Sequence, residues 1–160
     1  MMDVSQDLID LCSIYGLVLA GALTLVYLFS LKFNPEAWTA EFTNGKKKGD
    51  GRGQLYVSII MALTTLLVFY YADKEILNTF IDAGQPALFL ANGIIFIVYN
   101  LTDLLLVDYL LQLRIRPEFM DVPGQENQYK MRTHLSIFVR NFVYGGVLAF
   151  VASILATAMF

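Results

Sequence analysis

A polar run interrupts an otherwise apolar stretch of the chain, NLTDLLLVDYLL, which begins at Asn100. Asp103 and Asp108 stand there among leucines that are typical of a helix in the lipid core. An aspartate at the centre of a membrane-spanning helix costs about 2.5–3.5 kcal/mol on the insertion scale. Such aspartates pair with other groups, face a water-filled cavity, or carry protons and ions. The stretch is therefore a candidate site for proton or cation binding.

An α-helix over this stretch would separate the two aspartates. At about 100° per residue, Asn92, Tyr99 and Asp103 lie within about 40° of one another, with Asn100 about 60° from Asp103. Asp108 lies about 140° from Asp103 on the same helix. At about 1.5 Å per residue, Asp108 is about 8 Å from the following loop and Asp103 is about 15 Å from it. We therefore expect one polar face near the membrane midplane, with Asp108 outside it.

The two aspartates are expected at different depths in the membrane, so they can reach different partners. Asp108 can form a salt bridge with Arg114, Arg116 or Arg140, which would fix the loop to the helix. Asp103 has no loop charge within reach, so it needs a proton, a hydrogen-bonding neighbour or a hydrated cavity. Both a binding role and a plain interhelical hydrogen bond fit Asp103.

Two candidate sets of functional residues follow. The intramembrane polar site consists of Asn92, Tyr99, Asn100, Asp103 and Asn141. The cytoplasmic mouth consists of Asp108, Arg116, Glu126 and His134. His134, the only histidine, also fits a polar residue at a helix end without further function.

Metal binding and catalysis gain little support from these spacings. Two Asp, one Asn and one His would offer a mainly oxygen ligand set. However, the spacing of five positions from Asp103 to Asp108 divides the carboxylates between two sides of an α-helix. Cys12 is the only cysteine, which excludes an intrachain disulfide. The sequence therefore leaves metal ions, cofactors and catalytic residues unassigned.

The elements that position these residues are four long apolar segments, at 11–31, 55–72, 87–113 and 135–160. The chain is 57% hydrophobic and only 16% charged, whereas soluble domains are about 25% charged. A bilayer-spanning helix needs about 20 apolar residues. We therefore expect an all-α integral membrane four-helix bundle, with residues 1–160 forming a single transmembrane domain. The acidic N-terminal residues differ from a signal peptide, so the first segment is expected to be retained.

The basic residues predict the orientation. All eleven Lys and Arg residues except Lys74 fall in, or beside, the expected loops at 32–54 and 114–134. Short cytoplasmic loops carry such an excess, so both termini are expected outside. The segment NGKKKGDGRG, residues 44–53, is interpreted as a flexible loop or as a patch for anionic lipid, and it lacks the aromatics of a nucleic-acid site.

Small residues predict how the helices pack. Gly16 and Ala20 share one face of the first segment, and Gly145 and Ala149 share one face of the fourth. Close backbone approach at such faces drives helix association in lipid. The faces serve either packing within the monomer or a homo-oligomer. The sequence indicates two partners: the lipid bilayer and, in a homo-oligomer, a second copy of the chain.

The polar run also belongs to a longer pattern. Asn-x-x-Asp-x-x-x-x-Asp from Asn100 is followed by Arg-Pro-x-Phe from Arg116, Pro-Gly-x-Glu from Pro123, and then Tyr129 and His134. This combination resembles a group of small bacterial four-span membrane proteins of uncharacterised function. The resemblance implies the topology, a bacterial cytoplasmic membrane and candidate positions, but no activity. Independently of it, the proline after Arg116 predicts a helix end with Arg116 extended.

Three functional hypotheses remain. The leading one is a small polytopic membrane protein whose polar intramembrane site binds or conducts a small cation or proton, as an oligomer if it transports. The second is a membrane enzyme that acts on lipid at the cytoplasmic interface through the mouth residues. The third is an accessory or sensor subunit without chemistry, in which the polar residues hold helices together.

Overall fold

The computed structural model describes residues 4–38, 51–80, 84–120 and 126–159. The basic residues at 46–48 and the Pro-Gly pair at 123–124 therefore lie outside the described part. The long helices are α1 (Val4–Phe33), α3 (Gly51–Thr79), α4 (Gln85–Thr102), η2 (Asp103–Ile115) and α5 (Met131–Met159). Three short 3₁₀ turns connect them: η1 (Pro35–Trp38), η3 (Glu118–Met120) and η4 (Glu126–Tyr129).

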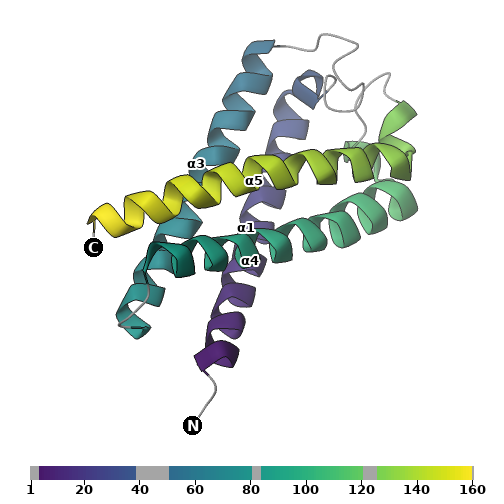
Figure 1. The fold of residues 1–160 in the computed structure, drawn as a ribbon. Coiled ribbons are helices and arrows are strands. Elements are labelled where there is room, and N and C mark those ends of the chain that lie inside the picture. Colours follow the sequence, from purple (N-terminus) through teal and green to yellow (C-terminus); the bar gives the residue numbers. More distant parts are fainter. Residues whose placement is uncertain (1–3, 39–50, 81–83, 121–125, 160) are drawn as a thin grey trace.

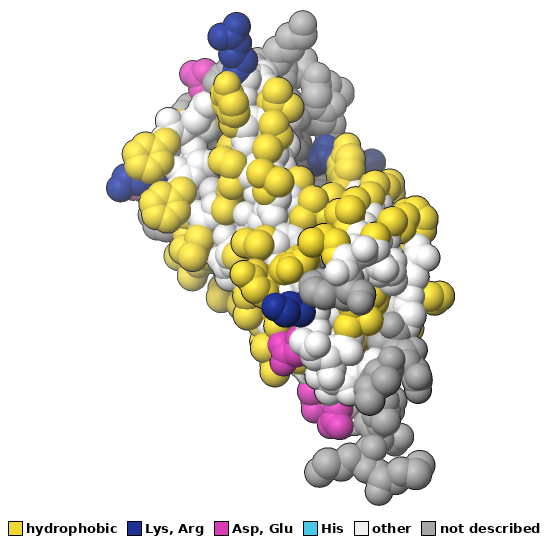
Figure 2. Space-filling view, turned by 90° about the vertical axis from the view of Figure 1, so that its left-hand side faces the viewer, with side chains coloured by type: hydrophobic (Ala, Val, Ile, Leu, Met, Phe, Trp, Pro, Cys, Tyr) yellow, Lys and Arg dark blue, Asp and Glu magenta, His cyan; other side chains and the backbone are white. Residues whose placement is uncertain are grey.

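The expectation of four apolar helices is confirmed. Four helical stretches are long and apolar enough to cross a membrane, with α4 and η2 joined into one stretch, Gln85–Ile115. Every described element is helical. Hydrophobic side chains cover most of the helical surface on the face that Figure 2 shows. This distribution is compatible with a multi-pass membrane protein, because lipid-facing helices expose apolar side chains.

The helices extend beyond the apolar runs that predicted them. The second segment was expected to end at residue 72, but α3 continues to Thr79. Ile76 is 1% exposed and continues the buried face of α3 past the charged residues Asp73, Lys74 and Glu75. Packing of Ile76 therefore prolongs the helix where charge alone predicted a loop.

Two helix pairs cross in the fold. Figure 1 shows α1 beside α3, and α5 beside α4–η2, with the second pair running across the first. The main core lies where the four helices meet and includes Leu19, Phe69, Ile95 and Ala149, each fully buried. A smaller cluster of Tyr27, Leu31, Val107 and Met120 joins the end of α1 to η2 and η3.

Glycines make this crossing possible. A Cβ on Gly16 would lie 2.6 Å from Cβ of Val98, and a Cβ on Gly145 would lie 1.9 Å from Cε1 of Phe96. Ala149 is also fully buried. Both predicted small-residue faces thus pack within the monomer, which is one of the two alternatives that the sequence left open. A homo-oligomer stays a prediction, and it would need other surfaces.

The close contact at Gly145 yields a stability prediction. Gly145→Ala should lower the free energy of unfolding by about 1–3 kcal/mol, because the added methyl displaces the buried Phe96 ring. Gly146→Ala is the matched control, since nothing lies within 4 Å of a Cβ built there. Thermal unfolding in detergent, followed by circular dichroism, measures both variants. Equal melting temperatures for the two would contradict this account of the helix crossing.

Candidate functional site

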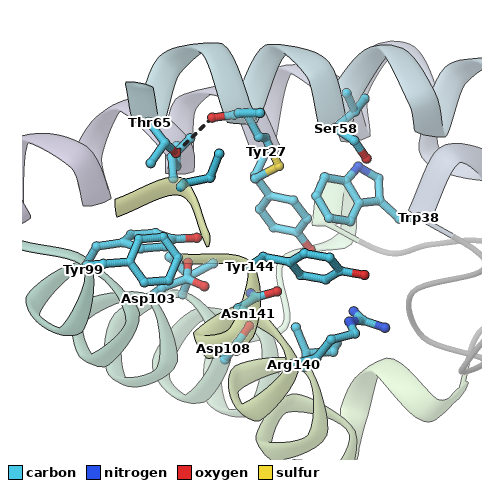
Figure 3. Close-up of a pocket in the computed structure, with 18 of the residues that line it drawn as sticks. Tyr27, Trp38, Ser58, Thr65, Tyr99, Asp103, Asp108, Arg140, Asn141 and Tyr144 are labelled. Atoms are coloured by element: carbon cyan, nitrogen blue, oxygen red, sulfur yellow. Dashed lines mark hydrogen bonds between the residues drawn. The ribbon is translucent and has the colours of Figure 1, made fainter. Parts of the chain in front are cut away.

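A cavity of about 770 Å³ lies between the two helix pairs, with walls from α1, η1, α3, α4, η2 and α5. It occupies the half of the bundle in which α1 ends and α5 begins. Figure 3 shows its polar side chains around a common space. The polar and charged lining residues are Tyr27, Gln54, Ser58, Thr65, Tyr99, Asp103, Asp108, Gln112, Arg140, Asn141 and Tyr144. Tyr99, Asp103 and Asn141 of the predicted intramembrane site therefore come together here.

The register of η2 determines which side chains reach this cavity. From Asp103 to Ile115 the backbone is a π-helix, which closes i→i+5 hydrogen bonds. Residues five apart therefore approach one face, as residues four apart do in an α-helix. Asp103 and Asp108 both line the cavity as a result. The expectation that Asp108 points away from Asp103, by about 140°, is wrong because it assumed α-helical turns.

The end of η2 also differs from its prediction. Arg116 has φ 53° and ψ 58°, the left-handed region, and its N–H donates to the carbonyl of Leu111 at 2.8 Å. The proline at 117 predicted an extended Arg116, which is wrong. The i→i+5 bond to Leu111 continues the π-helical pattern into the cap, and this hydrogen bond opposes the preference of a residue before proline.

Asp108 is held by His134 rather than by the arginines of the following loop. His134 Nδ1 lies 3.0 Å from Asp108 Oδ1, and His134 Nε2 lies 2.6 Å from the carbonyl oxygen of Gln128. Arg114 binds the Tyr109 hydroxyl at 2.7 Å, and the Arg116 guanidinium lies 4.9 Å from the Tyr129 ring centroid. The predicted salt bridge of Asp108 to Arg114 or Arg116 is therefore wrong. Arg140, the third partner considered, lines the same cavity as Asp108, and a salt bridge between them stays a prediction.

The imidazole of His134 lies between two oxygen atoms. Its ring nitrogens face the carboxylate of Asp108 and the carbonyl of Gln128. His134 therefore links η2 to η4 from its position on α5. His134 is 0% exposed and lies in the first turn of α5, so its polar contacts at this helix end are made inside the bundle. Asp108, not His134, is the member of this pair that faces the cavity.

The remaining predicted residues are dispersed. Asn100 is buried and donates to the carbonyl of Phe96 at 2.8 Å, within its own helix. Arg116 is exposed and does not line the large cavity. Glu126 begins η4, and its side chain lies outside the described part. Among the mouth residues whose side chains are described, Asp108 and His134 are in contact and Arg116 lies apart from them.

Asn92 belongs to a second polar site, at the other end of the bundle. Its Nδ2 donates to both carboxylate oxygens of Asp73, at 3.0 and 3.1 Å, and both side chains are 0% exposed. The expectation that Asn92 shares a site with Asp103 is therefore wrong. Sequence reasoning missed Asp73 because it stands at the end of an apolar run, next to two other charges. The sequence offered one signal that the helix continues past Asp73: the apolar residue Ile76, three positions further on.

Other site residues escaped prediction because their partners are distant in sequence. Gln112 is buried and donates to the hydroxyl of Tyr27, 85 residues earlier. Trp38 donates to Ser30 Oγ at 2.9 Å, which orients its ring toward the Tyr27 ring at 4.6 Å between centroids. These contacts fasten η1 and the end of α1 to η2. Tyr27 and Trp38, as aromatics near an expected membrane interface, carry a local sequence signal, whereas Gln112 does not.

The residues described do not include a group of three or more His, Cys, Asp and Glu side chains that could hold a metal ion. The contact between His134 and the Gln128 carbonyl occupies the nitrogen that a ligand would otherwise use. What the arrangement offers chemically is two carboxylates, three amides, one guanidinium and several hydroxyls on the wall of one cavity. Carboxylates in such a setting bind cations or exchange protons.

Comparison of the chain with protein-family models, with curated proteins and with solved structures finds no match. The resemblance to small bacterial four-span proteins therefore stays a prediction.

The buried Asp73–Asn92 pair can be tested by a double-mutant cycle. Asn92→Ala removes the amide that donates to a buried carboxylate, and should cost about 1–3 kcal/mol of stability. Asp73→Ala with Asn92→Ala should cost less than the sum of the single changes, by about 0.5–3 kcal/mol. Chemical unfolding in detergent gives the four free energies. Additive single effects would show that the two side chains are not coupled.

Proposed function

We propose that this chain is a small multi-pass membrane protein that binds a small cation or a proton at Asp103 and Asp108. In this proposal it lies in a bacterial cytoplasmic membrane with both termini outside. The cavity then occupies the cytoplasmic half of the bundle, beside the two basic loops. The supporting observation is the placement of both carboxylates on one cavity wall by the π-helix.

Electrostatics favours a cation over an anion in this cavity. Two carboxylates and one guanidinium, that of Arg140, line it. The lining also includes many apolar side chains, so the local dielectric is low and charges interact more strongly than in water. His134 neutralises part of the charge of Asp108, but Asp103 faces the cavity directly. Asp103 is therefore the primary cation or proton acceptor in the proposal.

The shape of the bundle supports binding over open conduction. The cavity reaches Thr65 and Leu148, and beyond them the described helices pack through fully buried residues such as Phe69, Ile95 and Ala149. Passage to the other side would require the two helix pairs to move. A carrier that binds in one half and then rearranges fits this shape better than a pore.

The alternative of a lipid-modifying enzyme loses its main catalytic group. A general base must come within about 2.6–3.2 Å of the proton that it abstracts, and His134 is enclosed by Asp108 and Gln128. Arg116, its phosphate-binding residue, packs on Tyr129 outside the cavity. We therefore prefer cation or proton binding.

Proton transport should depend on Asp103. Purified protein in liposomes loaded with a pH-sensitive dye should acidify or alkalise the interior under a K⁺ diffusion potential, faster than empty liposomes. Asp103→Asn should reduce this rate at least about tenfold, because the amide cannot exchange a proton with the cavity. Asp10→Asn is the control, since Asp10 is an exposed acid that bonds Gln6 on α1. Transport is contradicted if the flux into protein-containing liposomes equals the flux into empty liposomes in two separate assays, one for protons and one for Na⁺.

Orientation is testable by cysteine labelling in intact cells. In a Cys12→Ala background, Thr79→Cys should react with a membrane-impermeant maleimide added outside, because the α3–α4 connection is expected outside. Glu118→Cys should react only after permeabilisation. Thr79 and Glu118 are both exposed on the bundle, so a difference in their labelling reports the side of the membrane on which each lies. The reverse labelling pattern would invert the proposed orientation.

A further inference from the structure

Aromatic rings line the same cavity as the two aspartates. They come from three walls: Tyr27 and Trp38 from α1 and η1, Phe96 and Tyr99 from α4, and Tyr144 from α5. Tyr27 and Trp38 meet edge to face at 4.6 Å, and Phe96 and Tyr99 do so at 5.2 Å. Aromatic faces attract cations, most strongly organic ammonium groups that are weakly hydrated. Carboxylates and rings together therefore select positive charge on an apolar molecule.

The volume of the cavity points to the same class of ligand. At about 770 Å³ it falls within the range of about 300–1,000 Å³ that is typical of sites for organic ligands. An inorganic cation alone would leave it to be filled by on the order of 25 waters, at about 30 Å³ each. Much of that water would contact leucine, valine and methionine side chains. An apolar body attached to the charge fills this space better.

The rim of the cavity shows how such a ligand would enter. Ser58 on α3, and Tyr144 and Val147 on α5, line the cavity and are exposed. The opening therefore lies between α3 and α5, along the sides of helices that are apolar enough to cross a membrane. A hydrophobic cation dissolves in the bilayer and reaches this opening from the side.

Arg140 is compatible with this ligand. Figure 3 shows its guanidinium away from Asp103, with Asn141 and Tyr144 between them in that view. A positive head beside Asp103 thus avoids the positive charge of Arg140, and an anion beside Arg140 would share the cavity with two carboxylates. The distribution of charge orients a cationic ligand with its head toward η2.

We propose that the cavity binds hydrophobic organic cations, of the quaternary ammonium or phosphonium class. Asp103 is the counter-ion, Tyr99 and Tyr144 pack against the charged centre, and the apolar walls contact the substituents. This inference rests on the proposed function, because it uses the same carboxylate, and it adds the identity of the cation.

Trp38 provides the readout, since it is the only tryptophan of the chain and lines the cavity. Titration of the purified protein with tetraphenylphosphonium, with excitation of tryptophan alone, should give a saturable change in emission. Tetraphenylborate, an anion of nearly the same size and shape, is the matched probe and should bind at least about tenfold more weakly. Equal affinities for the two ions would overturn the role of charge.

Variants locate the charge that is responsible. Asp103→Asn should weaken tetraphenylphosphonium binding at least about tenfold, while Asp103→Glu, which keeps the charge, should bind within a few-fold of wild type. Asp10→Asn should leave the affinity unchanged. Gel filtration and circular dichroism show which variants fold, and the glutamate variant keeps the test decisive if the asparagine variant does not. Unchanged affinity in Asp103→Asn would overturn Asp103 as the counter-ion.

The outcomes also separate this inference from the function on which it rests. If proton flux depends on Asp103 but tetraphenylphosphonium produces no saturable change, the organic-cation inference is wrong and the proposed function stands. If tetraphenylphosphonium binds through Asp103 and no flux of protons or Na⁺ occurs, the cavity is a binding site without ion transport. Absence of both signals contradicts both proposals.

Discussion

The site depends on the register of one helical stretch. From Asp103 to Ile115 the chain turns as a π-helix, and this turn brings Asp103 and Asp108 to one cavity wall. Side-chain contacts support the register from two directions: His134 of α5 meets Asp108, and Tyr27 of α1 meets Gln112. π-Helical turns are rare and occur frequently at functional sites. Without this register the two acids would point to different sides, and only one could face the cavity.

The bundle has a closely packed half and a half that contains the cavity. Gly16 and Gly145 let the backbones of α1 and α5 approach α4 closely. The cavity lies in the half where α1 ends and α5 begins, with Ser58 of α3 and Tyr144 of α5 exposed at its rim. Close packing at small residues provides association energy in lipid, so the half with the cavity does not have to contribute all of it.

Much of this fold could be predicted from the sequence, because apolar length and small-residue spacing act locally. The four helices and the faces of Gly16 and Gly145 are of this kind. The π-helix could not be predicted, since its hydrogen bonds differ from those of an α-helix by one residue and its supporting partners come from distant helices. The sequence places Asp108 and His134 in one candidate site, but it predicts an arginine as the salt-bridge partner of Asp108. That error and the missed burial of Asp73 have the same cause, because tertiary contacts decide both.

The three acids Asp73, Asp103 and Asp108 differ in the helix contacts that a ligand at each would disturb. Asp73 receives both hydrogen bonds of its carboxylate from Asn92, so a ligand there would compete with a contact between α3 and α4. Asp108 is bound to His134, so a ligand there would compete with a contact between η2 and α5. Asp103 lines the cavity beside them, within electrostatic reach of Asp108 and His134. A carboxylate at this depth is costly, and the contacts of Asp73 with Asn92 and of Asp108 with His134 do not involve the Asp103 side chain. In the proposed function, a cation or proton at Asp103 would therefore leave the contacts of Asp73 and Asp108 in place.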